Sequence, residues 1–373
     1  MPKLTPITAV TSPDPYPYYA DLVAGQPFGF DDAQRMWVAA GAGAVSAVLA
    51  EPVLQVRPPA EPVPNGIVGT AAGKVFGRLV RMTDGTLQQR LKQTVVAALG
   101  TARPERTAAV AAARTADALK RSASVRELMF GVPAEVVAVL CGLDDDHADE
   151  ASTLIAEFVG CIPATATVPQ QQAAARAAAA LTDLLGPALR DRGDGLLAEL
   201  VRAAHPDTEP AALLANGIGL LSQTFDATAG LIGNTIVTLG RLTDDELRRP
   251  DRLPAVVDEV ARHDAPIQNT RRFAAGPVTV AGSRLAAGEA VLVVLAAANR
   301  DPAANEAPAE FRPDRVDRTV FTFGAGAHAC PGRSIASTIA AAVVSELLAS
   351  GFEPTDLAPP TYLPLANARI PAL

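Results

Sequence analysis

The stretch Phe321–Ala336, "FTFGAGAHACPGRSIA", places a cysteine among glycines, directly before a segment with the apolar spacing of a helix. A thiolate that binds a metal needs shielding from water and backbone N–H donors close to the sulfur. Glycine lets the backbone approach the sulfur and adopt a positive φ where needed. Pro331 stiffens the turn, and we expect the N-terminal dipole of the next helix to lie near the sulfur. One cysteine cannot build a zinc or iron–sulfur site, but it can be the single axial ligand of a haem.

The segment Phe323–Gly332, "FGAGAHACPG", resembles the haem-binding signature F-G-x-G-x-H-x-C-x-G of the cytochrome P450 family, and all six fixed positions match. The resemblance implies a haem b cofactor whose iron binds the thiolate of Cys330. It also implies a mainly α fold with a minor β portion and a long central helix over the haem. The loop residues that would surround the cofactor are Phe323, Gly324, Gly326 and Gly332. The alternative is a chance glycine-rich loop around an inert, buried cysteine.

Two further segments look like structural elements of the same family. Glu259 and Arg262 are similar to its E-x-x-R pair, and residues three apart share a helix face, so that the two can form an ion pair. Such a pair also occurs by chance on solvated helices. The segment "FRPDRV" contains Arg315, which by resemblance joins that pair. We therefore expect Glu259, Arg262 and Arg315 to brace the cysteine loop as structural residues.

Buried haem propionates need cationic or hydrogen-bonding partners, and the fork of arginine suits a carboxylate. By resemblance, Arg272 and His328 are these partners. The family usually adds H-x-x-x-R on an earlier helix, where this chain has Gln88 and Lys92. These two face the same way and can both donate hydrogen bonds. A solvated helix face remains an alternative, with Arg90 as another donor.

The thirty residues 211–240 contain one charged side chain, Asp226. Polar residues and five glycines make this segment unsuitable for lipid, so we predict a helix through a globular core. By resemblance, Asp226 is the acid that helps deliver protons during oxygen activation. Ala227 stands where the family has a threonine, and alanine cannot relay a proton.

Gln223 and Thr224 stand where the family usually has small residues, so we expect them to border the oxygen site. One interpretation is that the hydroxyls of Thr224 and Thr228 bond back to carbonyls one turn earlier. The other is that Thr224, Gln223, a water or a substrate hydroxyl supplies the missing donor. Ordinary hydroxylation and less usual chemistry, such as oxidative cyclisation, coupling or peroxide-driven oxidation, therefore both remain open.

Composition supports a helical chain, because 49% of the 373 residues are apolar and only 4% are aromatic, which leaves a core of alanine, leucine and valine. We expect a single haem domain over residues 1–373 with no fused reductase domain. The predicted elements are a strand at 36–40, an irregular loop at 51–70, helices from 84, within 104–200, at 251–263 and from 333, and a small β unit from 276.

A formal charge of −8 gives no support for nucleic-acid binding. We find no signal peptide or membrane anchor, and three cysteines make no disulfide framework, so we expect a cytoplasmic protein. No flavin or nicotinamide fingerprint is present, so electrons would come from a separate ferredoxin with its ferredoxin reductase, or a similar donor. A scattered solvated surface is the alternative to a basic docking face for that donor made of Arg78, Arg81, Arg90 and Arg333.

The resemblance is to soluble, actinomycete-like bacterial monooxygenases, and it implies a small or medium organic substrate, plausibly in natural product biosynthesis. We expect the substrate to be enclosed by residues 61–80, 150–200, 222–226 and 266–273. An enzyme that cyclises or couples without inserting oxygen is one alternative. A haem-binding protein for sequestration or sensing, without turnover, is another.

Overall fold

The structure is a computed structural model that describes residues 4–190, 193–242 and 244–373. Its chain divides into two compact units. The first comprises Met1–Pro59, Gly230–Cys330 and Leu348–Leu373, and the second comprises Ala60–Ala229 and Pro331–Leu347. The interpretation of the chain as one haem domain stays a prediction.

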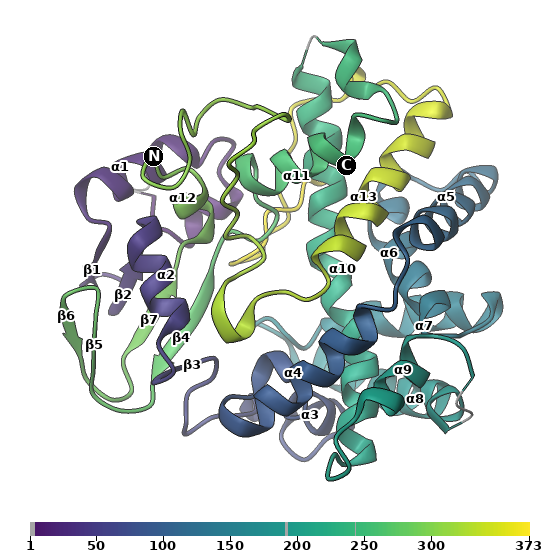
Figure 1. The fold of residues 1–373 in the computed structure, drawn as a ribbon, viewed down its shortest axis with the longest axis horizontal. Helices are drawn as coiled ribbons and strands as arrows, with labels where there is room; N and C mark the ends of the chain where they lie inside the picture. The colour runs from purple at the N-terminus through teal and green to yellow at the C-terminus, as the bar shows by residue number, and fades with distance from the viewer. Residues whose placement is uncertain (1–3, 191–192, 243) are drawn as a thin grey trace. The chain divides into compact units, whose positions relative to one another are not determined.

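Helices dominate the structure, as the composition predicts (Figure 1). The helices of the first unit are α1 (Tyr16–Gly25), α2 (Ala42–Ala50), α11 (Leu253–His263) and α12 (Leu295–Asn299). Those of the second unit are α3 (Ala71–Phe76), α4 (Gly85–Leu99), α5 (Pro104–Lys120), α6 (Val125–Leu140), α7 (Asp145–Val159), α8 (Val168–Arg190) and α9 (Leu196–Ala203). Two helices include residues of both units: α10 (Pro210–Arg241) and α13 (Arg333–Ala349). The predicted fold class, mainly α with a minor β portion, is confirmed.

The β portion lies in the first unit and forms a five-stranded sheet in the order β1-β2-β7-β4-β3. Its strands are β1 (Phe28–Asp31), β2 (Met36–Ala39), β3 (Leu54–Gln55), β4 (Thr270–Ala274) and β7 (Ala290–Val293). Strands β2 and β7 are parallel, whereas the other neighbours are antiparallel. A separate hairpin joins β5 (Val278–Val280) to β6 (Ser283–Leu285) through Gly282, whose φ of 79° favours glycine.

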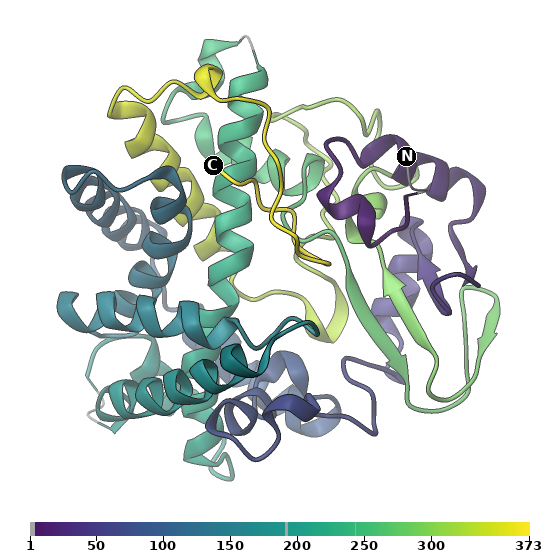
Figure 2. The same ribbon diagram turned by 180° about the vertical axis from the view of Figure 1, so that it is seen from behind.

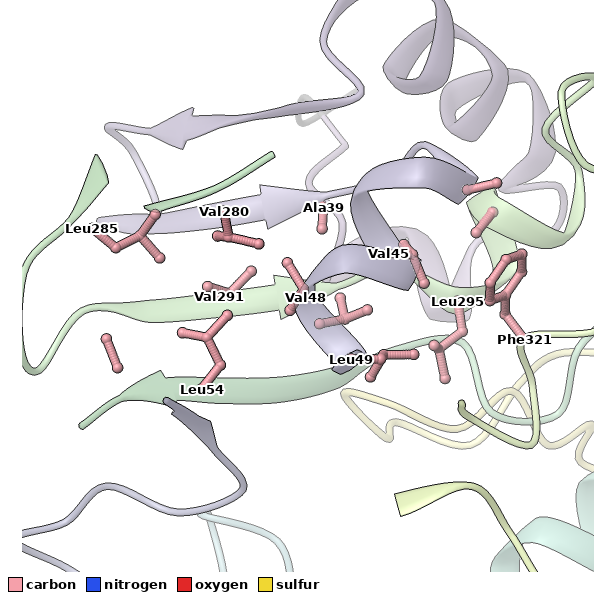
Figure 3. Packing of buried hydrophobic residues seen from close by; sticks show 14 residues of the cluster. Ala39, Val45, Val48, Leu49, Leu54, Val280, Leu285, Val291, Leu295 and Phe321 are labelled. Carbon is pink, nitrogen blue, oxygen red and sulfur yellow. The ribbon is translucent and has the colours of Figure 1, made fainter. Parts of the chain in front are cut away.

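Helix α2 covers one face of this sheet, and the apolar side chains between them form a core (Figure 3). Val45, Val48 and Leu49 of α2 pack with Val291 of β7. Phe321, the first residue of the cysteine stretch, belongs to the same cluster and is 6% exposed. The core of the first unit therefore anchors the entry to the cysteine loop.

The second unit is built from α3–α9, the part of α10 up to Ala229 and the part of α13 up to Leu347 (Figure 2). Glycines let other segments approach α10 closely, because a Cβ on Gly217 would lie 2.6 Å from Leu197 and one on Gly219 would lie 2.9 Å from Leu79. The side chain of Asn216 forms hydrogen bonds with the N–H of Val80 and the carbonyl oxygen of Arg78. Close packing, and not lipid, explains the glycine-rich and apolar sequence of this helix.

The predicted helices from 84, within 104–200, over 211–240, over 251–263 and from 333 are confirmed, as is the strand near 36–40. Strands β1, β3 and β4 were not predicted. Strand β3 has only two residues, and β4 carries charged side chains where an apolar alternation is expected. Among the described residues, no helix is long and apolar enough to span a membrane.

Candidate functional site

The cysteine loop up to Cys330 lies in the first unit and is held by its own backbone, whereas Pro331 and the half-buried Gly332 belong to the second unit. The N–H of Cys330 donates to the carbonyl oxygen of Phe323 at 2.7 Å, and that of Gly324 donates to Phe321 at 2.7 Å. Gly324 and Gly326 have φ values of 67° and 65°, which favour glycine. A Cβ on Gly326 would also lie 2.9 Å from the carbonyl oxygen of Leu49. The glycines are therefore required by the shape of the loop and by its contact with α2.

Cys330 is exposed and forms no disulfide, whereas Cys141 and Cys161 are buried. Burial raises the pKa of the Cys141 thiol to about 12, which removes it as a source of thiolate. The inert, buried cysteine that the sequence left as an alternative is therefore wrong for position 330. Only Cys330, of the three, presents a thiol that an external group can reach.

A buried ion-pair network lies beside the start of this loop. Glu259 and Arg262 are both fully buried and 2.6 Å apart at their closest atoms. Burial alone would raise the pKa of Glu259, but hydrogen bonds from Arg262 and the Arg312 backbone N–H outweigh it and hold the pKa below its usual value. Arg262 also donates to the carbonyl oxygens of Pro308 and Glu310. The predicted structural role of the pair agrees with this geometry.

The prediction that Arg315 joins this network is confirmed, and Arg318 is a further member that the sequence did not predict. Arg318 donates from Nε to Glu259 Oε2 at 2.9 Å. The Nε of Arg315 forms an ion pair with Glu259 Oε1 at 3.6 Å but no hydrogen bond to any described residue, while its terminal nitrogens donate to backbone carbonyls. Arg318 is thus the direct partner of Glu259, and Arg315 is an outer neighbour.

Asn299, at the end of α12, connects this network to the cysteine stretch. Its Oδ1 accepts from the N–H of Phe321 at 2.6 Å, and its Nδ2 donates to the hydroxyl of Thr322 at 2.8 Å. Arg262 donates to the carbonyl oxygen of Asn299 at 3.3 Å. Sequence reasoning did not assign Asn299 a role.

Arg272 and His328 also belong to the first unit. Arg272 lies in β4, is 5% exposed, and donates to the carbonyl oxygen of Arg271 at 2.8 Å. His328 ends the short helix Gly326–His328 and is half-buried. A buried arginine and a half-buried histidine are suitable carboxylate partners, but their role toward propionates stays a prediction.

Asp226, the predicted acid, lies in the second unit on α10 and is half-buried. Burial raises its pKa, and the charge of Arg81 partly offsets that shift. Burial likewise lowers the pKa of Arg81, with the charge of Asp226 opposing. The sequence placed Arg81 on a basic surface, but in the structure its Nε is buried and without a hydrogen-bond partner among the described residues.

Two polar side chains near Asp226 on α10 form hydrogen bonds with the backbone of the same helix. Thr224 Oγ1 donates to the carbonyl oxygen of Leu220 at 2.8 Å, and Gln223 Nε2 donates to that of Gly219 at 3.0 Å. The backbone-bonded interpretation is confirmed for Thr224 and wrong for Thr228. Thr228 is fully buried, and its hydroxyl has no partner in the part of the chain that the structure describes.

Gln88 and Lys92 lie one turn apart on α4 of the second unit. Gln88 is 2% exposed and Lys92 is half-buried, so the alternative of a solvated face is wrong for Gln88. Arg90 is exposed. The role of Gln88 and Lys92 toward a propionate stays a prediction.

The remaining predicted docking residues differ in exposure. Arg333 and Arg90 are exposed, whereas Arg78 is half-buried and lies 3.7 Å from a carboxylate oxygen of Glu209. Arg81 is also half-buried, so two of the four arginines of the predicted basic face are exposed.

Comparisons with known proteins identify the family of this chain. The family model described as cytochrome P450 matches residues 235–353. Cytochrome P450 107B1 of Saccharopolyspora erythraea is 31% identical over 280 residues, which cover 71% of this chain and 68% of that protein. The chain belongs to the cytochrome P450 family. A second protein of that organism, 6-deoxyerythronolide B hydroxylase, is 34% identical over 213 residues, and the match covers 55% of this chain and about half (52%) of the hydroxylase.

Solved cytochrome P450 structures share the fold. The crystal structure of CalO2 superposes with a TM-score of 0.85 at 24% identity, covering 100% of this chain and 98% of that one. The structure of P450BioI in complex with a fatty-acyl acyl carrier protein gives a TM-score of 0.82 at 22% identity, covering 96% of each chain. At these identities the likeness concerns the fold alone.

Cytochromes P450 contain haem with an axial cysteine thiolate, and the residues present fit that group. Cys330 is an exposed thiol outside any disulfide, in a loop whose glycines adopt positive φ values. The loop is braced before any ligand is considered, through Asn299 and the buried Glu259–Arg262 pair. A pre-formed loop that presents one thiol is the arrangement that a single axial ligand requires.

Proposed function

We propose that this protein is a haem-thiolate monooxygenase that oxidises a small or medium organic molecule with O2 and electrons from a separate donor. The observation that carries the proposal is the exposed thiol of Cys330 in a braced glycine loop, in a chain of the cytochrome P450 family. Bound through a thiolate, haem supplies oxygen activation, because the thiolate pushes electron density toward O–O cleavage.

Each polar residue has a proposed role in that activity. Cys330 holds the iron, Arg272 and His328 bind propionates, and Gln88 with Lys92 supplies further donors. Asp226 manages protons, because its raised pKa lets the carboxyl keep a proton at a higher pH than a fully solvated aspartate would. The retained acid favours turnover over mere haem storage, since a binding protein has no need for it.

The substrate is proposed to be a precursor of a specialised metabolite. Support comes from a matched relative named 6-deoxyerythronolide B hydroxylase and from a structural neighbour described as the cytochrome P450 PksS of a bacillaene polyketide synthase. A ferredoxin with its reductase is the proposed electron source, and the cytoplasm is the proposed location.

The carbon-monoxide difference spectrum of the reduced protein tests the assignment of Cys330. We expect the red-shifted band typical of a thiolate ligand, and its loss in Cys330→Ser. Cys161→Ser is the matched control, because that buried thiol is expected to leave the band in place. A wild-type spectrum without the thiolate band would overturn the proposal.

A second candidate function is oxidative cyclisation, coupling or peroxide-driven oxidation. It is favoured by Ala227 together with the hydrogen bonds that tie Thr224 and Gln223 to the helix backbone, which leave no evident side-chain replacement for the family threonine. Turnover with a surrogate ferredoxin system, compared with turnover with hydrogen peroxide, separates peroxide-driven oxidation from oxidation with O2, and the mass of the product shows whether oxygen has been inserted. Product formation only with peroxide would favour the second, and haem binding without turnover in either assay would indicate a non-catalytic haem protein.

A further inference from the structure

The side chain of Asn299 contacts both residues that lead into the cysteine loop. Its Oδ1 accepts from the N–H of Phe321, and its Nδ2 donates to the hydroxyl of Thr322. That hydroxyl in turn donates to the carbonyl oxygen of Ala261 on α11. Asn299 is fully buried, so water does not compete for these hydrogen bonds. The peptide group between Phe321 and Thr322 is therefore held on both sides by one side-chain amide.

Two further hydrogen bonds connect this peptide group to Cys330. The carbonyl oxygen of Phe321 accepts from the N–H of Gly324, and the carbonyl oxygen of Phe323 accepts from the N–H of Cys330, both at 2.7 Å. The C=O of Phe323 and the N–H of Gly324 belong to one planar peptide group, which cannot tilt without distorting both hydrogen bonds. The position of Phe321 therefore constrains the backbone of Cys330 through a single peptide group.

A second buried asparagine supports the first. The Oδ1 of Asn305 accepts from the N–H of Thr319, and its Nδ2 donates to the carbonyl oxygens of Thr319 and Asn299, each at 3.0 Å. Asn305 is 2% exposed. Side-chain amides thus satisfy the backbone groups of Thr319 and Phe321, which a neighbouring strand would otherwise have to pair.

We propose that Asn299, supported by Asn305, is a positioning residue for the axial thiolate: by fixing Phe321 it fixes the backbone that presents the sulfur of Cys330. The inference rests on the proposed function, since it takes Cys330 as the ligand of the haem iron. It adds that thiolate ligation depends on a neutral side chain outside the cysteine loop. Groups that orient a metal ligand commonly change metal affinity or activity by about 10–100-fold when they are removed.

Asn299→Ala tests the proposal on the haem-loaded protein, through the reduced carbon-monoxide spectrum and the reduction potential of the haem. Without an acceptor for the N–H of Phe321, the fraction of haem outside the thiolate band should rise about tenfold. The reduction potential should also rise, because less electron density reaches the iron from the sulfur. Asn216→Ala is the matched control, because Asn216 also accepts from a backbone N–H and donates to a backbone carbonyl. It should lower stability but keep the band and the potential.

Two variants separate the hydrogen bonds of Asn299. Asn299→Asp retains an oxygen that can accept from Phe321, so it should restore most of the thiolate band. Thr322→Val removes the partner of Nδ2 and leaves the hydrogen bond to Phe321, so it should also keep the band. Equal losses in Asn299→Ala and Thr322→Val would contradict the proposal. Equal losses in Asn299→Ala and Asn216→Ala would show general destabilisation and overturn it too.

If Asn299→Ala does not fold, Asn305→Ala takes its place, because Thr319 is exposed and its backbone groups can bind water instead. This variant should raise the fraction of haem outside the thiolate band by about threefold, since one supporting residue is lost. An unchanged band and potential in whichever variant folds would overturn this inference alone. A wild type without the thiolate band would overturn the proposed function and this inference with it.

Discussion

At the scale of the residue, Ala227 distinguishes this chain most sharply from the family pattern to which it belongs. It follows the acid Asp226 on α10 and has no group that can move a proton. Its nearest candidate substitutes do not help, because Thr224 is bonded within the helix and the hydroxyl of Thr228 is fully buried. On the proposed function, we therefore expect proton delivery to depend on Asp226 with water or substrate.

Ala227→Thr is expected to change how electrons are used. A restored hydroxyl should help proton delivery and lower the fraction of reducing equivalents released as hydrogen peroxide, by roughly threefold to tenfold if one acid–base contact is gained. The measurement is the amount of hydrogen peroxide formed per reduced nicotinamide consumed by the surrogate reductase, in the presence of substrate. Ala229→Ser adds a hydroxyl at a fully buried position of the same helix and controls for a general effect. An unchanged ratio would mean that position 227 does not set the chemistry.

At the scale of the element, α11 carries a buried ion pair that holds neighbouring segments of the first unit. Its Glu259–Arg262 pair forms hydrogen bonds with the segment 308–318. Asn299 forms a hydrogen bond with Phe321, at the start of the cysteine stretch. Burying such charges is costly unless every one is paired and hydrogen-bonded, and here both are. The arrangement adds hydrogen bonds at Phe321 and Thr322 to those that the loop makes within its own backbone.

Double-mutant cycles should distinguish the two candidate arginine partners of Glu259. Arg318→Ala combined with Glu259→Gln is expected to show a coupling free energy of about 1–3 kcal/mol, because a buried charged hydrogen bond joins them. The same cycle with Arg315→Ala should give a clearly smaller coupling, since 3.6 Å separates Arg315 Nε from the carboxylate without a hydrogen bond. Chemical denaturation provides the free energies of unfolding. Equal couplings would contradict the assignment of Arg318 as the direct partner.

At the scale of the whole molecule, segments distant in sequence meet in the first unit at Arg369. This fully buried arginine donates to Asp264 Oδ1 at 2.9 Å and to the carbonyl oxygens of Val10 and Pro13 at 3.0 Å. The hydroxyl of Tyr16 donates to the same carboxylate oxygen at 2.6 Å. Burial, and next the charge of Asp264, raises the pKa of Tyr16. The N-terminal segment, the end of α11 and the C-terminal segment are thereby joined.

Arg369→Met should destabilise the protein by roughly 3–5 kcal/mol, because it leaves Asp264 buried without its charged partner. The N-terminal segment should also become sensitive to limited proteolysis, since three carbonyl groups lose their donor. Thermal denaturation and mass spectrometry of the fragments measure both effects. Arg284→Met, at an exposed position of β6, is the control and should change neither. Retained stability with an intact N-terminus would show that Arg369 is not a clamp.

Much of the fold was predictable because its signals are local. Apolar spacing predicted α4 and α13, a thirty-residue run with a single charge predicted α10, and a small β unit was expected where β5 and β6 form their hairpin. Strand β4 escaped prediction because its sequence, "TRRFA", is charged, and its place in the sheet comes from pairing with β7.

Some residues of the candidate site could be predicted from the sequence and others could not. A contiguous motif specified Cys330 and its glycines, since their requirements are set within ten residues of chain. Arg315 and Arg318 stand three apart in an irregular segment, where no periodicity tells which one reaches Glu259. The environment of Arg81 could not be predicted from the sequence, because Asn216, which fixes the preceding residues, lies 136 residues after its partner Val80.

The sequence by itself therefore determined the family, the haem ligand and the missing threonine, all of which depend on residue identity at neighbouring positions. Only the tertiary structure decided how Arg315 and Arg318 each lie against Glu259, that Thr228 is buried without a hydrogen-bond partner among the described residues, and that Asn216 fixes the 78–80 segment on α10. Burial and pairing of charge are properties of what surrounds a side chain, and those surroundings come from segments far apart in the chain.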